Sequence, residues 1–438
     1  MAPAQASGAS PPERSGADLL RFAAIGSVDD GKSTLIGRLL VDSRQLFDDQ
    51  LDALDKASRR RGISQVELAF VTDGLKAERE QGITIDVAYR YAATPQRKYV
   101  IADCPGHVQY TANMATGAST ADLALVVVDV TAGLKEQTRR HVAIASLLGV
   151  DQMLVAANKM DLARWEKAAY LRTTEQMSDL AQRLSISSHC VVPVSALAGD
   201  NVVATTASAP WYEGPSILEC LQEAPAGGWA AAHSADGASR LAVQWVLRET
   251  ARRAYAGVVG GAPLHRGDSV VVLPSGRASS ISSISTYDGD LEEAPVGISV
   301  AVELTDDIDV SRGDLIASAA EPPLVTTELQ ATVCWFGARP LEQGARLALK
   351  HTTRTSPVRV QEVLGRFDVN KLEMSEAESI QDNEIGVVSL TTGTPLAVDP
   401  YHSNRVTGSF VLVDPATHAT LAACMVGTPL LSRPSPLR

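Results

Sequence analysis

Hydrophobic and polar positions divide the chain into two parts with different periodicities. In the first part, short apolar runs alternate with longer stretches whose apolar positions recur with a helical period. The apolar runs cover residues 20–25, 99–102, 123–128, 152–157 and 191–194, and the clearest helical candidates are residues 135–148 and 165–184. Runs that are apolar at nearly every position indicate strands buried on both faces. The pattern predicts an α/β domain with a mostly parallel sheet between helices, which binds ligands at the carboxyl ends of its strands.

After residue 240 the pattern changes to short strands separated by turn residues. Strands are expected at residues 241–246, 269–273, 331–335, 358–364 and 409–413, with turns at 274–276, 288–290 and 312–314. This spacing is typical of barrels or sandwiches. Because residues 321–323 interrupt it, two β-domains of ordinary size are expected. The predicted organisation is a disordered leader at 1–17, an α/β domain at 18–225, a linker at 226–239, and β-barrel domains at 240–322 and 323–438.

The strongest chemical signal lies where the first predicted strand ends. Residues 26–34 fit the pattern G-x-x-x-x-G-K-[ST], in which backbone N–H groups surround a phosphate chain. The strand before this loop and the amphipathic helix after it would place the phosphates at a helix N-terminus. A plain glycine-rich turn is the alternative. Nucleotide contacts are expected from Gly26, Ser27, Val28, Asp29, Asp30, Gly31, Lys32, Ser33 and Thr34.

Further segments follow in the order that a guanine nucleotide site requires. Asp103 and Gly106 follow a strand directly, where they can reach Mg²⁺ and a γ-phosphate oxygen. The carboxylate of Asp161 can accept from N1–H and the exocyclic amine of guanine, an edge that adenine lacks. A backbone N–H after the last strand could donate to guanine O6. Each segment alone could be a common turn or a helix N-cap, but their combination favours guanine. The residues expected around the base are Asn158, Lys159, Asp161, Ser195, Ala196 and Leu197.

The same segments suggest roles in phosphoryl transfer. Lys32 would balance the charge of the β- and γ-phosphates, and Gly106 would donate its N–H to the γ-phosphate. Thr84 could complete the Mg²⁺ coordination and sense the γ-phosphate. His107 stands where a glutamine orients water in Ras-like enzymes, although it could merely pack beside the loop. The expected Mg²⁺ ligands are Ser33, Thr84 and Asp103.

Composition narrows the cellular context. The net charge of −12 argues mildly against a broad nucleic-acid footprint. The five cysteines contain no C-x-x-C pair, so a disulfide framework or a zinc site is not expected and a reducing cytoplasm is the default. Residues 1–17 lack the apolar core of a signal peptide, and no apolar run is long enough to span a membrane.

The combination of motifs and β-domains resembles the translation-factor class of GTPases. The closer resemblance is to the large, GTP-hydrolysing subunit of sulfate adenylyltransferase. Most elongation factors have His or Ala before the Gly-Lys of the loop, where this chain has Asp30. The resemblance covers residues 18–430 and is carried by segments 73–91, 113–119, 210–215, 272–276, 287–294 and 399–408. The chain departs from the family pattern at Val108, where glutamate is usual, at Cys104, where threonine is common, and over residues 247–253.

The resemblance implies an α/β P-loop GTPase domain followed by two small all-β barrels, with GTP and Mg²⁺ as cofactors. It implies that GTP hydrolysis drives formation of adenylyl sulfate and pyrophosphate from ATP and sulfate on a separate small catalytic subunit. The chain contains neither S-G-G-x-D-S nor H-x-G-H, so it should not transfer adenylyl groups alone. It has no second phosphate loop, so the fused adenylylsulfate kinase of some family members is not expected. The expected protein is cytoplasmic and binds neither nucleic acid nor membrane. The alternatives are a translation factor that binds tRNA and the ribosome, and a copy dedicated to a specialised pathway.

Overall fold

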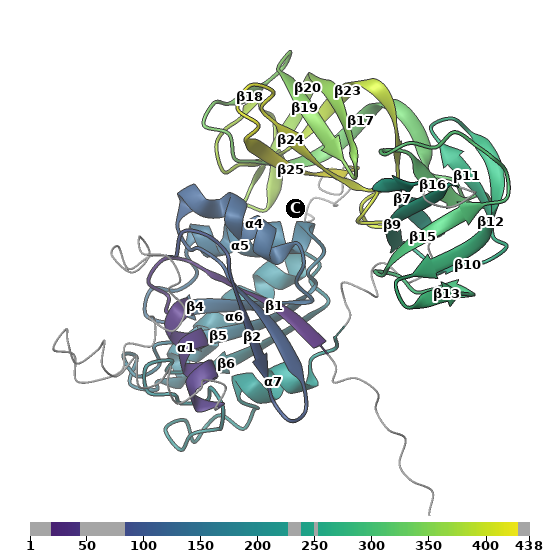
Figure 1. Ribbon diagram of the computed structural model, residues 1–438. Coiled ribbons are helices and arrows are strands. Elements are labelled where there is room, and N and C mark those ends of the chain that lie inside the picture. The colour runs from purple at the N-terminus through teal and green to yellow at the C-terminus, as the bar shows by residue number, and fades with distance from the viewer. Residues whose placement is uncertain (1–18, 44–83, 227–237, 249–252, 428–438) are drawn as a thin grey trace, which may run out of the picture.

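The computed structural model shows an N-terminal α/β domain and two β-barrels (Figure 1). It describes residues 19–43, 84–226, 238–248 and 253–427. The predicted leader, most of the predicted linker and residues 73–83 of the family segment lie outside these ranges. Within them, no helix is both long enough and apolar enough to cross a bilayer. The predicted fold class, an α/β domain followed by two barrels, is confirmed.

A six-stranded sheet forms the centre of the N-terminal domain, with the strand order β2-β3-β1-β4-β5-β6. All neighbouring strands run parallel except β2, which pairs antiparallel with β3 at one edge. The strands are β1 Leu19–Gly26, β2 Ala88–Ala93, β3 Lys98–Asp103, β4 Leu123–Asp129, β5 Gln152–Asn158 and β6 Ser188–Pro193. The five strands predicted from apolar runs are therefore present, whereas the half-exposed β2 gave no apolar run and was not predicted.

Helices cover both faces of this sheet. Alternate side chains of β1 and β4 pack into two different hydrophobic clusters, one on each face, which explains why these strands are apolar throughout. One cluster contains residues of α4, α5 and α6, and the other contains residues of α1 and α7. The helices are α1 Lys32–Asp42, η2 Val108–Tyr110, α4 Thr111–Ala118, α5 Glu136–Leu147, α6 Lys167–Arg183 and α7 Ile217–Glu223. The sheet is thus held so that the carboxyl ends of its parallel strands share one edge.

The first barrel follows the strand order β11-β16-β7-β9-β15-β12-β13 and closes through pairing of β11 with β12. Its strands are β7 Arg240–Ala242, β8 Trp245–Leu247, β9 Ala254–Gly260, β11 Ser269–Leu273, β12 Arg277–Thr286, β13 Gly289–Leu291, β15 Ser299–Leu304 and β16 Leu315–Ser318, with the small pair β10 Leu264–His265 and β14 Glu293–Ala294. The single strand expected at 241–246 is wrong, because the chain divides there into β7 and β8. The opposite strand has Gly257 at this point, where a Cβ would lie 2.5 Å from the Ala242 carbonyl oxygen.

The second barrel follows the order β19-β24-β25-β17-β23-β20-β21 and closes through pairing of β19 with β20. Its strands are β17 Leu324–Trp335, β19 Arg346–His351, β20 Arg354–Asp368, β21 Glu373–Ser375, β23 Ile385–Val398, β24 Ser409–Val413 and β25 Thr420–Val426, with the small pair β18 Leu341–Glu342 and β22 Ser379–Ile380. The strands expected at 331–335 and 358–364 are only parts of β17 and β20. Bulges in the β20 pairing break its alternation, so the sequence pattern underestimates its length.

The second barrel packs on α4 and α5 of the N-terminal domain (Figure 1). Barrel residues such as Phe367 and Met425 belong to the same hydrophobic cluster as Ala115 and Ala118 of α4. Polar contacts lie beside this cluster: the Tyr401 hydroxyl donates to the Leu148 carbonyl at 2.9 Å, and Arg405 donates to the Gly149 carbonyl at 2.6 Å. The α4 helix is therefore in direct contact with the barrel.

A buried ion pair joins the two barrels. Arg240 on β7 binds both carboxylate oxygens of Asp399, at 2.9 and 3.0 Å, and the Thr407 hydroxyl also donates to Asp399. The side chains of Arg240 and Asp399 are only 5% and 11% exposed. Removing one charge from such a pair leaves the other buried without compensation.

We expect Arg240→Met to destabilise the barrels by about 3–5 kcal/mol, because it leaves the Asp399 carboxylate buried and unpaired. Calorimetric unfolding of the full chain would show a lower Tm for the barrel transition. The matched control is Arg253→Met, since the Arg253–Asp309 pair is exposed and its loss should cost under about 1 kcal/mol. Equal losses in the two variants would contradict a structural role for the Arg240–Asp399 pair.

Candidate nucleotide-binding site

The predicted phosphate loop connects the end of β1 to the start of α1. Gly26 and Gly31 both have positive φ, at 147° and 92°. A Cβ on Gly26 would lie 2.5 Å from the Val127 carbonyl oxygen, and one on Gly31 would lie 2.4 Å from the Asn158 side-chain nitrogen. Both positions therefore exclude larger residues on two grounds, conformation and space. The loop shape depends on these two glycines.

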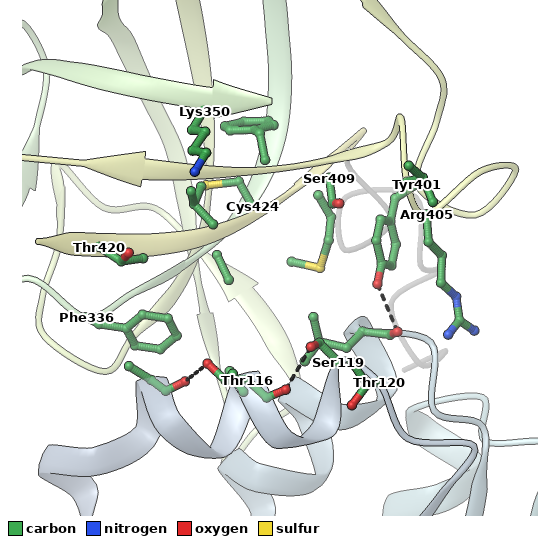
Figure 2. A pocket seen from close by; sticks show the side chains of 18 of the residues that line it. Thr116, Ser119, Thr120, Phe336, Lys350, Tyr401, Arg405, Ser409, Thr420 and Cys424 are labelled. Carbon is green, nitrogen blue, oxygen red and sulfur yellow. Dashed lines mark hydrogen bonds between the residues drawn. The ribbon is translucent and has the colours of Figure 1, made fainter. Parts of the chain in front are cut away.

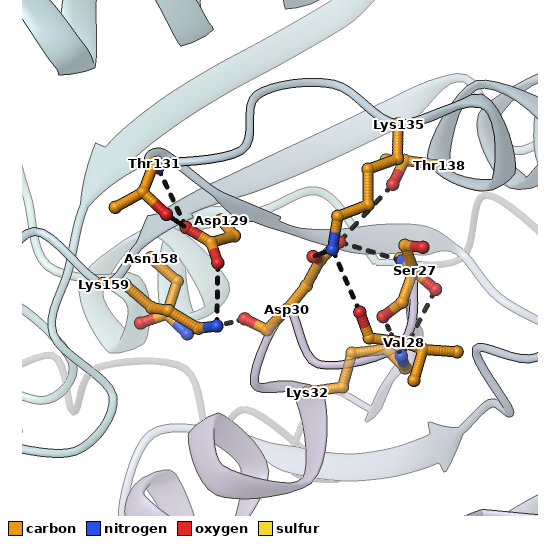
Figure 3. A network of polar contacts seen from close by, with 11 residues as sticks. Ser27, Val28, Asp30, Lys32, Asp129, Thr131, Lys135, Thr138, Asn158 and Lys159 are labelled. Atoms are coloured by element: carbon orange, nitrogen blue, oxygen red, sulfur yellow. Dashed lines mark hydrogen bonds and ion pairs between the residues drawn. The ribbon is translucent and has the colours of Figure 1, made fainter. Parts of the chain in front are cut away.

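A network of polar contacts holds the loop from one side (Figure 3). The Asp30 carboxylate is fully buried, accepts from the Ser27 N–H at 3.0 Å and pairs with Lys135 at 2.7 Å. Lys135 also donates to the Val28 carbonyl at 3.1 Å. Because these partners surround Asp30, its carboxylate is positioned to shape the loop rather than to face a ligand. Lys135 lies in no motif, so its contact with the loop was not predicted from the sequence.

Lys32 lies inside the curve of the loop. Its ammonium donates to the carbonyls of Gly26 and Ser27, at 3.2 and 2.7 Å. Burial lowers the pKa of Lys32 below its usual value, in opposition to the nearby charges of Asp103 and Asp30. The α1 helix that begins at Lys32 has no side-chain N-cap and no acidic residue in its first turn. The N-terminal N–H groups of α1 are thus left for an anion.

Gly106 brings the segment after β3 directly against this loop. A Cβ on Gly106 would lie 2.4 Å from the Lys32 ammonium nitrogen and 2.9 Å from the Ser27 carbonyl carbon. Only glycine fits at this distance, so the Asp-x-x-Gly motif and the phosphate loop are built around each other. Cys104, which lies between Asp103 and Gly106, is fully buried, and burial raises the pKa of its thiol. Cys104 is therefore a core residue.

The three expected Mg²⁺ ligands lie together. The Ser33 hydroxyl is 3.5 Å from the Thr84 hydroxyl and 3.4 Å from an Asp103 carboxylate oxygen. Hydroxyl and carboxylate oxygens are the donors that Mg²⁺ prefers, and Mg²⁺ needs few protein ligands when it also binds phosphates. The described residues contain no cluster of three or more His, Cys, Asp or Glu side chains. The oxygen atoms of Ser33, Thr84 and Asp103 are of the kind that suits a hard cation.

His107 follows Gly106 at the start of η2. Its ring is half-buried and lies edge-on to the ring of Tyr110, with centroids 6.3 Å apart. Val108, the departure from the family pattern, is 47% exposed beside it. The ring of His107 is thus held next to the residue that contacts Lys32, and its role in orienting water stays a prediction.

Asn158 connects the phosphate loop to the segment after β6. Its side-chain nitrogen donates to the Asp30 carbonyl at 2.8 Å, and its side-chain oxygen accepts from the Ala196 N–H at 2.9 Å. Asn158 was expected at the base, but this linking role could not be predicted, because the two partners are remote in sequence. Asn158 is therefore a structural link between two parts of the site.

Lys159 is held by an ion pair behind the motif. It has a left-handed backbone, with φ of 64°, and its ammonium lies 2.8 Å from the Asp129 carboxylate. Burial favours the neutral form of Asp129, but hydrogen bonds from Lys159 and Thr131 outweigh this effect and lower its pKa. Asp129 ends β4 and was not identified from sequence. Together these contacts fix the turn that carries Asp161, whose side chain is exposed.

The backbone around Ser195 presents one free donor. The N–H groups of Ser195, Ala196 and Ala198 donate to the Asp200 carbonyl, Asn158 and the Ser195 hydroxyl. The N–H of Leu197 has no acceptor among the described residues, and the Leu197 side chain is 60% exposed. Of the three residues expected in this segment, Leu197 is therefore the one positioned to donate to a ligand.

A buried histidine, also missed from sequence, links the loop to α4. The Gly26 N–H donates to His141 Nδ1 at 3.4 Å, and His141 Nε2 is 2.8 Å from the side-chain amide of Gln137. That amide donates to the Thr111 hydroxyl at the start of α4. Burial lowers the pKa of His141 to about 3, so the ring is neutral at ordinary pH. These contacts join the phosphate loop, α5 and α4.

A cavity of about 780 Å³ lies between α4 and the second barrel (Figure 2). Thr116 and Ser119 line it from α4, while Phe336, Lys350 and Thr420 line it from the barrel. The hydroxyls of Thr116 and Ser119 hydrogen-bond to carbonyls of their own helix. Packing between α4 and the barrel is therefore incomplete, although Tyr401 contacts the Leu148 carbonyl at the end of α5 beside the cavity.

Two protein-family models match parts of this chain. The Elongation factor Tu GTP binding domain matches residues 17–226, and the GTP-eEF1A C-terminal domain-like model matches residues 328–427. A solved structure of sup35 complexed with GDP aligns over 94% of both chains with 22% identity and a TM-score of 0.42.

Relatives at much higher identity cover nearly the whole chain. A protein named "Bifunctional enzyme CysN/CysC" from Mycobacterium tuberculosis (strain ATCC 25618 / H37Rv) is 48% identical over 95% of this chain and 69% of its own length. Proteins named "Sulfate adenylyltransferase subunit 1" are 46% identical in Aeromonas hydrophila and 48% identical in Laribacter hongkongensis. These two alignments cover 93% of this chain and 86% and 85% of the relatives. The chain therefore belongs to the family of sulfate adenylyltransferase subunit 1, within the translation-factor class of GTPases.

Proposed function

We propose that the protein is the GTPase subunit of sulfate adenylyltransferase. It hydrolyses GTP and thereby drives formation of adenylyl sulfate and pyrophosphate from ATP and sulfate on a separate small subunit. The observation that carries this proposal is the close fit of Gly106 against Lys32 and Ser27, in a chain that is 46–48% identical to relatives named for this enzyme. This fit brings a phosphate-sensing segment to a phosphate-binding loop.

The phosphate chain would bind within the curve of residues 26–34. The N–H groups of the loop and of the first turn of α1 would donate to phosphate oxygens. Lys32 would exchange its carbonyl acceptors for the β- and γ-phosphates, and their negative charge would offset the effect of burial on its pKa. Gly106, next to the Lys32 ammonium, would donate its N–H to the γ-phosphate. Only a triphosphate would therefore engage Gly106.

Guanine would bind between the Asn158 turn and the Ser195 segment. The exposed carboxylate of Asp161 would accept from N1–H and the exocyclic amine, and the free N–H of Leu197 would donate to O6. Adenine presents a donor where guanine has O6 and has no exocyclic amine at the edge that Asp161 faces. A site that leaves buried or fixed polar groups unpaired rejects the wrong base strongly. The expected hydrogen bonds of Asp161 and of the Leu197 N–H therefore favour binding of GTP over ATP.

Mg²⁺ would be held by Ser33, Thr84 and Asp103, with Asp103 reaching it directly or through water. When bound, Mg²⁺ would neutralise charge on the β- and γ-phosphate oxygens. Thr84 would thereby join the segment before β2 to the nucleotide. The remaining catalytic requirement is a group that orients the attacking water, and His107 is the side chain adjacent to Gly106 that can do so.

Hydrolysis would be transmitted through α4 to the barrels. The side chain of Asn113 on α4 donates to the Ile85 carbonyl at 2.8 Å, one residue after Thr84. Loss of the γ-phosphate would release Thr84, which precedes Ile85, and Gly106, which precedes α4. Both partners of the contact between Asn113 and Ile85 would then be less constrained. The cavity between α4 and the second barrel provides space for α4 to shift (Figure 2). The face shown to the small subunit would change accordingly.

Other features of the proposal follow from the same family. The expected complex is a heterodimer with the small catalytic subunit, in the cytoplasm, a reducing compartment that agrees with the five cysteines being free thiols in the structure. We retain the boundaries 18–225, 240–322 and 323–438, which are supported by the end of β16 at Ser318 and the start of β17 at Leu324. The alternative, a translation factor that binds tRNA and the ribosome, shares the domain models but not the names of the relatives.

We expect His107→Ala to slow GTP hydrolysis by on the order of 10² while nucleotide affinity changes little, because the substitution removes the water-orienting group and leaves the phosphate loop intact. Single-turnover hydrolysis and GDP binding would be measured on the same preparation. His402→Ala, at an exposed histidine of the second barrel, is the control and should hydrolyse GTP normally. Unchanged turnover in His107→Ala would show that His107 only packs beside the loop.

We expect Thr84→Ala to bind GDP normally but to uncouple GTP hydrolysis from adenylyl sulfate formation, because the hydroxyl that senses the γ-phosphate is lost. The assay contains the small subunit, ATP and sulfate, and measures GTP consumed per adenylyl sulfate formed. Thr84→Ser keeps the hydroxyl and should retain coupling. If Thr84→Ala remained tightly coupled, the proposed route through Thr84 would be wrong.

A further inference from the structure

Two cysteines on the surface of the N-terminal domain lie next to each other. The sulfur atoms of Cys190 on β6 and Cys220 on α7 are 3.9 Å apart. Cys190 is exposed and Cys220 is half-buried, whereas Cys104, Cys334 and Cys424 are buried. The two elements lie together at the end of the domain away from the barrels (Figure 1). The pair is therefore the part of the cysteine set that reagents in solution can reach.

The surroundings favour reaction at Cys190. The hydrogen bond from Cys220 lowers the pKa of Cys190 to about 7, and the same bond together with burial raises the pKa of Cys220. Cys190 is also the more exposed sulfur, so it is the one that a reagent in solution meets first, and a thiolate is the nucleophile in disulfide exchange. The ionisable groups that act on the pair are Tyr170 of α6, Tyr212, and Glu219 and Glu223 of α7.

The backbone on both sides of the pair is fixed. Residues Leu221 and Ala224, at the end of α7, accept hydrogen bonds from the buried Arg97 side chain. The start of α7 is held by a capping box between Ser216 and Glu219. Cys190 pairs with Leu154 in the sheet. A disulfide requires a sulfur separation of about 2.05 Å, so the sulfurs need to approach by under about 2 Å, which side-chain rotation can supply between two fixed elements.

We propose that Cys190 and Cys220 are a modification site that closes to a reversible intramolecular disulfide by exchange with a low-molecular-weight disulfide such as glutathione disulfide. The Cys190 thiolate attacks one sulfur of the reagent, forms a mixed disulfide and releases one thiolate. Cys220 then loses its proton, attacks the Cys190 sulfur and releases the second thiolate. Both released thiolates take up the protons that the protein has lost, so the protein is oxidised by two electrons and the reagent is reduced to two thiols.

The ring closed by this disulfide contains the segment expected to contact the base. Thirty positions separate the two cysteines, and Ser195, Ala196 and Leu197 lie between them. The same ring contains Asn201, whose side chain donates to the Pro193 carbonyl at 2.8 Å and whose carbonyl accepts from the Ile217 N–H at 3.0 Å. Joining β6 to α7 would restrict the fluctuations of this segment, and a less mobile base segment would release a nucleotide more slowly. We therefore expect oxidation to slow GDP release.

The experiment treats the reduced full chain with glutathione disulfide, alkylates the remaining thiols and maps peptides by mass spectrometry. Wild type should lose two hydrogens, join the Cys190 and Cys220 peptides within one molecule and recover both thiols with dithiothreitol. Cys220→Ser should retain one glutathionyl group on Cys190, and Cys190→Ser should keep Cys220 as a thiol. Cys334 and Cys424 serve as buried internal controls and should stay reduced.

Three outcomes would overturn the proposed site. They are full alkylation of both cysteines after treatment, glutathione retained on Cys190 of wild type, and a disulfide that joins two molecules. Each is read directly from wild type, so the result does not depend on how well a variant folds. The result also does not depend on nucleotide binding, so it stands apart from the proposed function.

The effect on nucleotide release rests on the proposed function and is tested separately. Dissociation of fluorescent GDP should be several-fold slower from the oxidised chain than from the reduced chain, with no change in Cys190→Ser treated in the same way. Equal rates from reduced and verified oxidised wild type would contradict the effect on the base segment. Failure of the reduced chain to bind GDP would instead contradict the proposed function and leave the mass result intact.

Discussion

The close contact between Gly106 and the phosphate loop is the constraint on which the site depends. At this contact a Cβ on Gly106 would lie 2.4 Å from the Lys32 ammonium nitrogen and 2.9 Å from the Ser27 carbonyl carbon, so position 106 has no room for a side chain. Gly31 and Asn158 make a second close approach on the other side of the loop. The loop after β1 is thus approached by two segments, one that follows β3 and one at the end of β5, and these contacts hold its backbone in place. Preorganised donors of this kind lose less free energy on binding than flexible ones.

The sheet brings these parts together because its parallel strands end at one edge. Gly26, Asp103, Asp129 and Asn158 each end a strand of that sheet. Two cores, one on each face, fix the strand positions, and the core that includes α4 continues into the second barrel. In the proposed mechanism, a change at the γ-phosphate would reach the barrel through these packed side chains and through the contact between Asn113 and Ile85. This continuity would give hydrolysis a physical route to the proposed partner subunit.

Much of the fold follows from the sequence, because buried strands and glycine-rich turns have strong local signals. The strands that are buried on both faces and the order of one α/β domain and two barrels were predictable for this reason. The half-exposed β2, the division between β7 and β8, and the full lengths of β17 and β20 were not, because bulges and edge pairing depend on contacts remote in sequence. In the site, motif residues were identifiable from spacing. Lys135, Asp129 and His141 were not, since each acts through a partner that only the fold brings near.

The most direct test of the account is GTP hydrolysis by this chain, alone and with the small subunit, each with and without ATP plus sulfate. Coupled sulfate activation requires a large increase in GTP hydrolysis only when the small subunit and both substrates are present together. Stimulation by ribosomes with no response to ATP and sulfate would contradict the account and favour a translation factor. A rate that no combination raises would also contradict it, because the proposed route from the γ-phosphate to the partner would then have no consequence for catalysis.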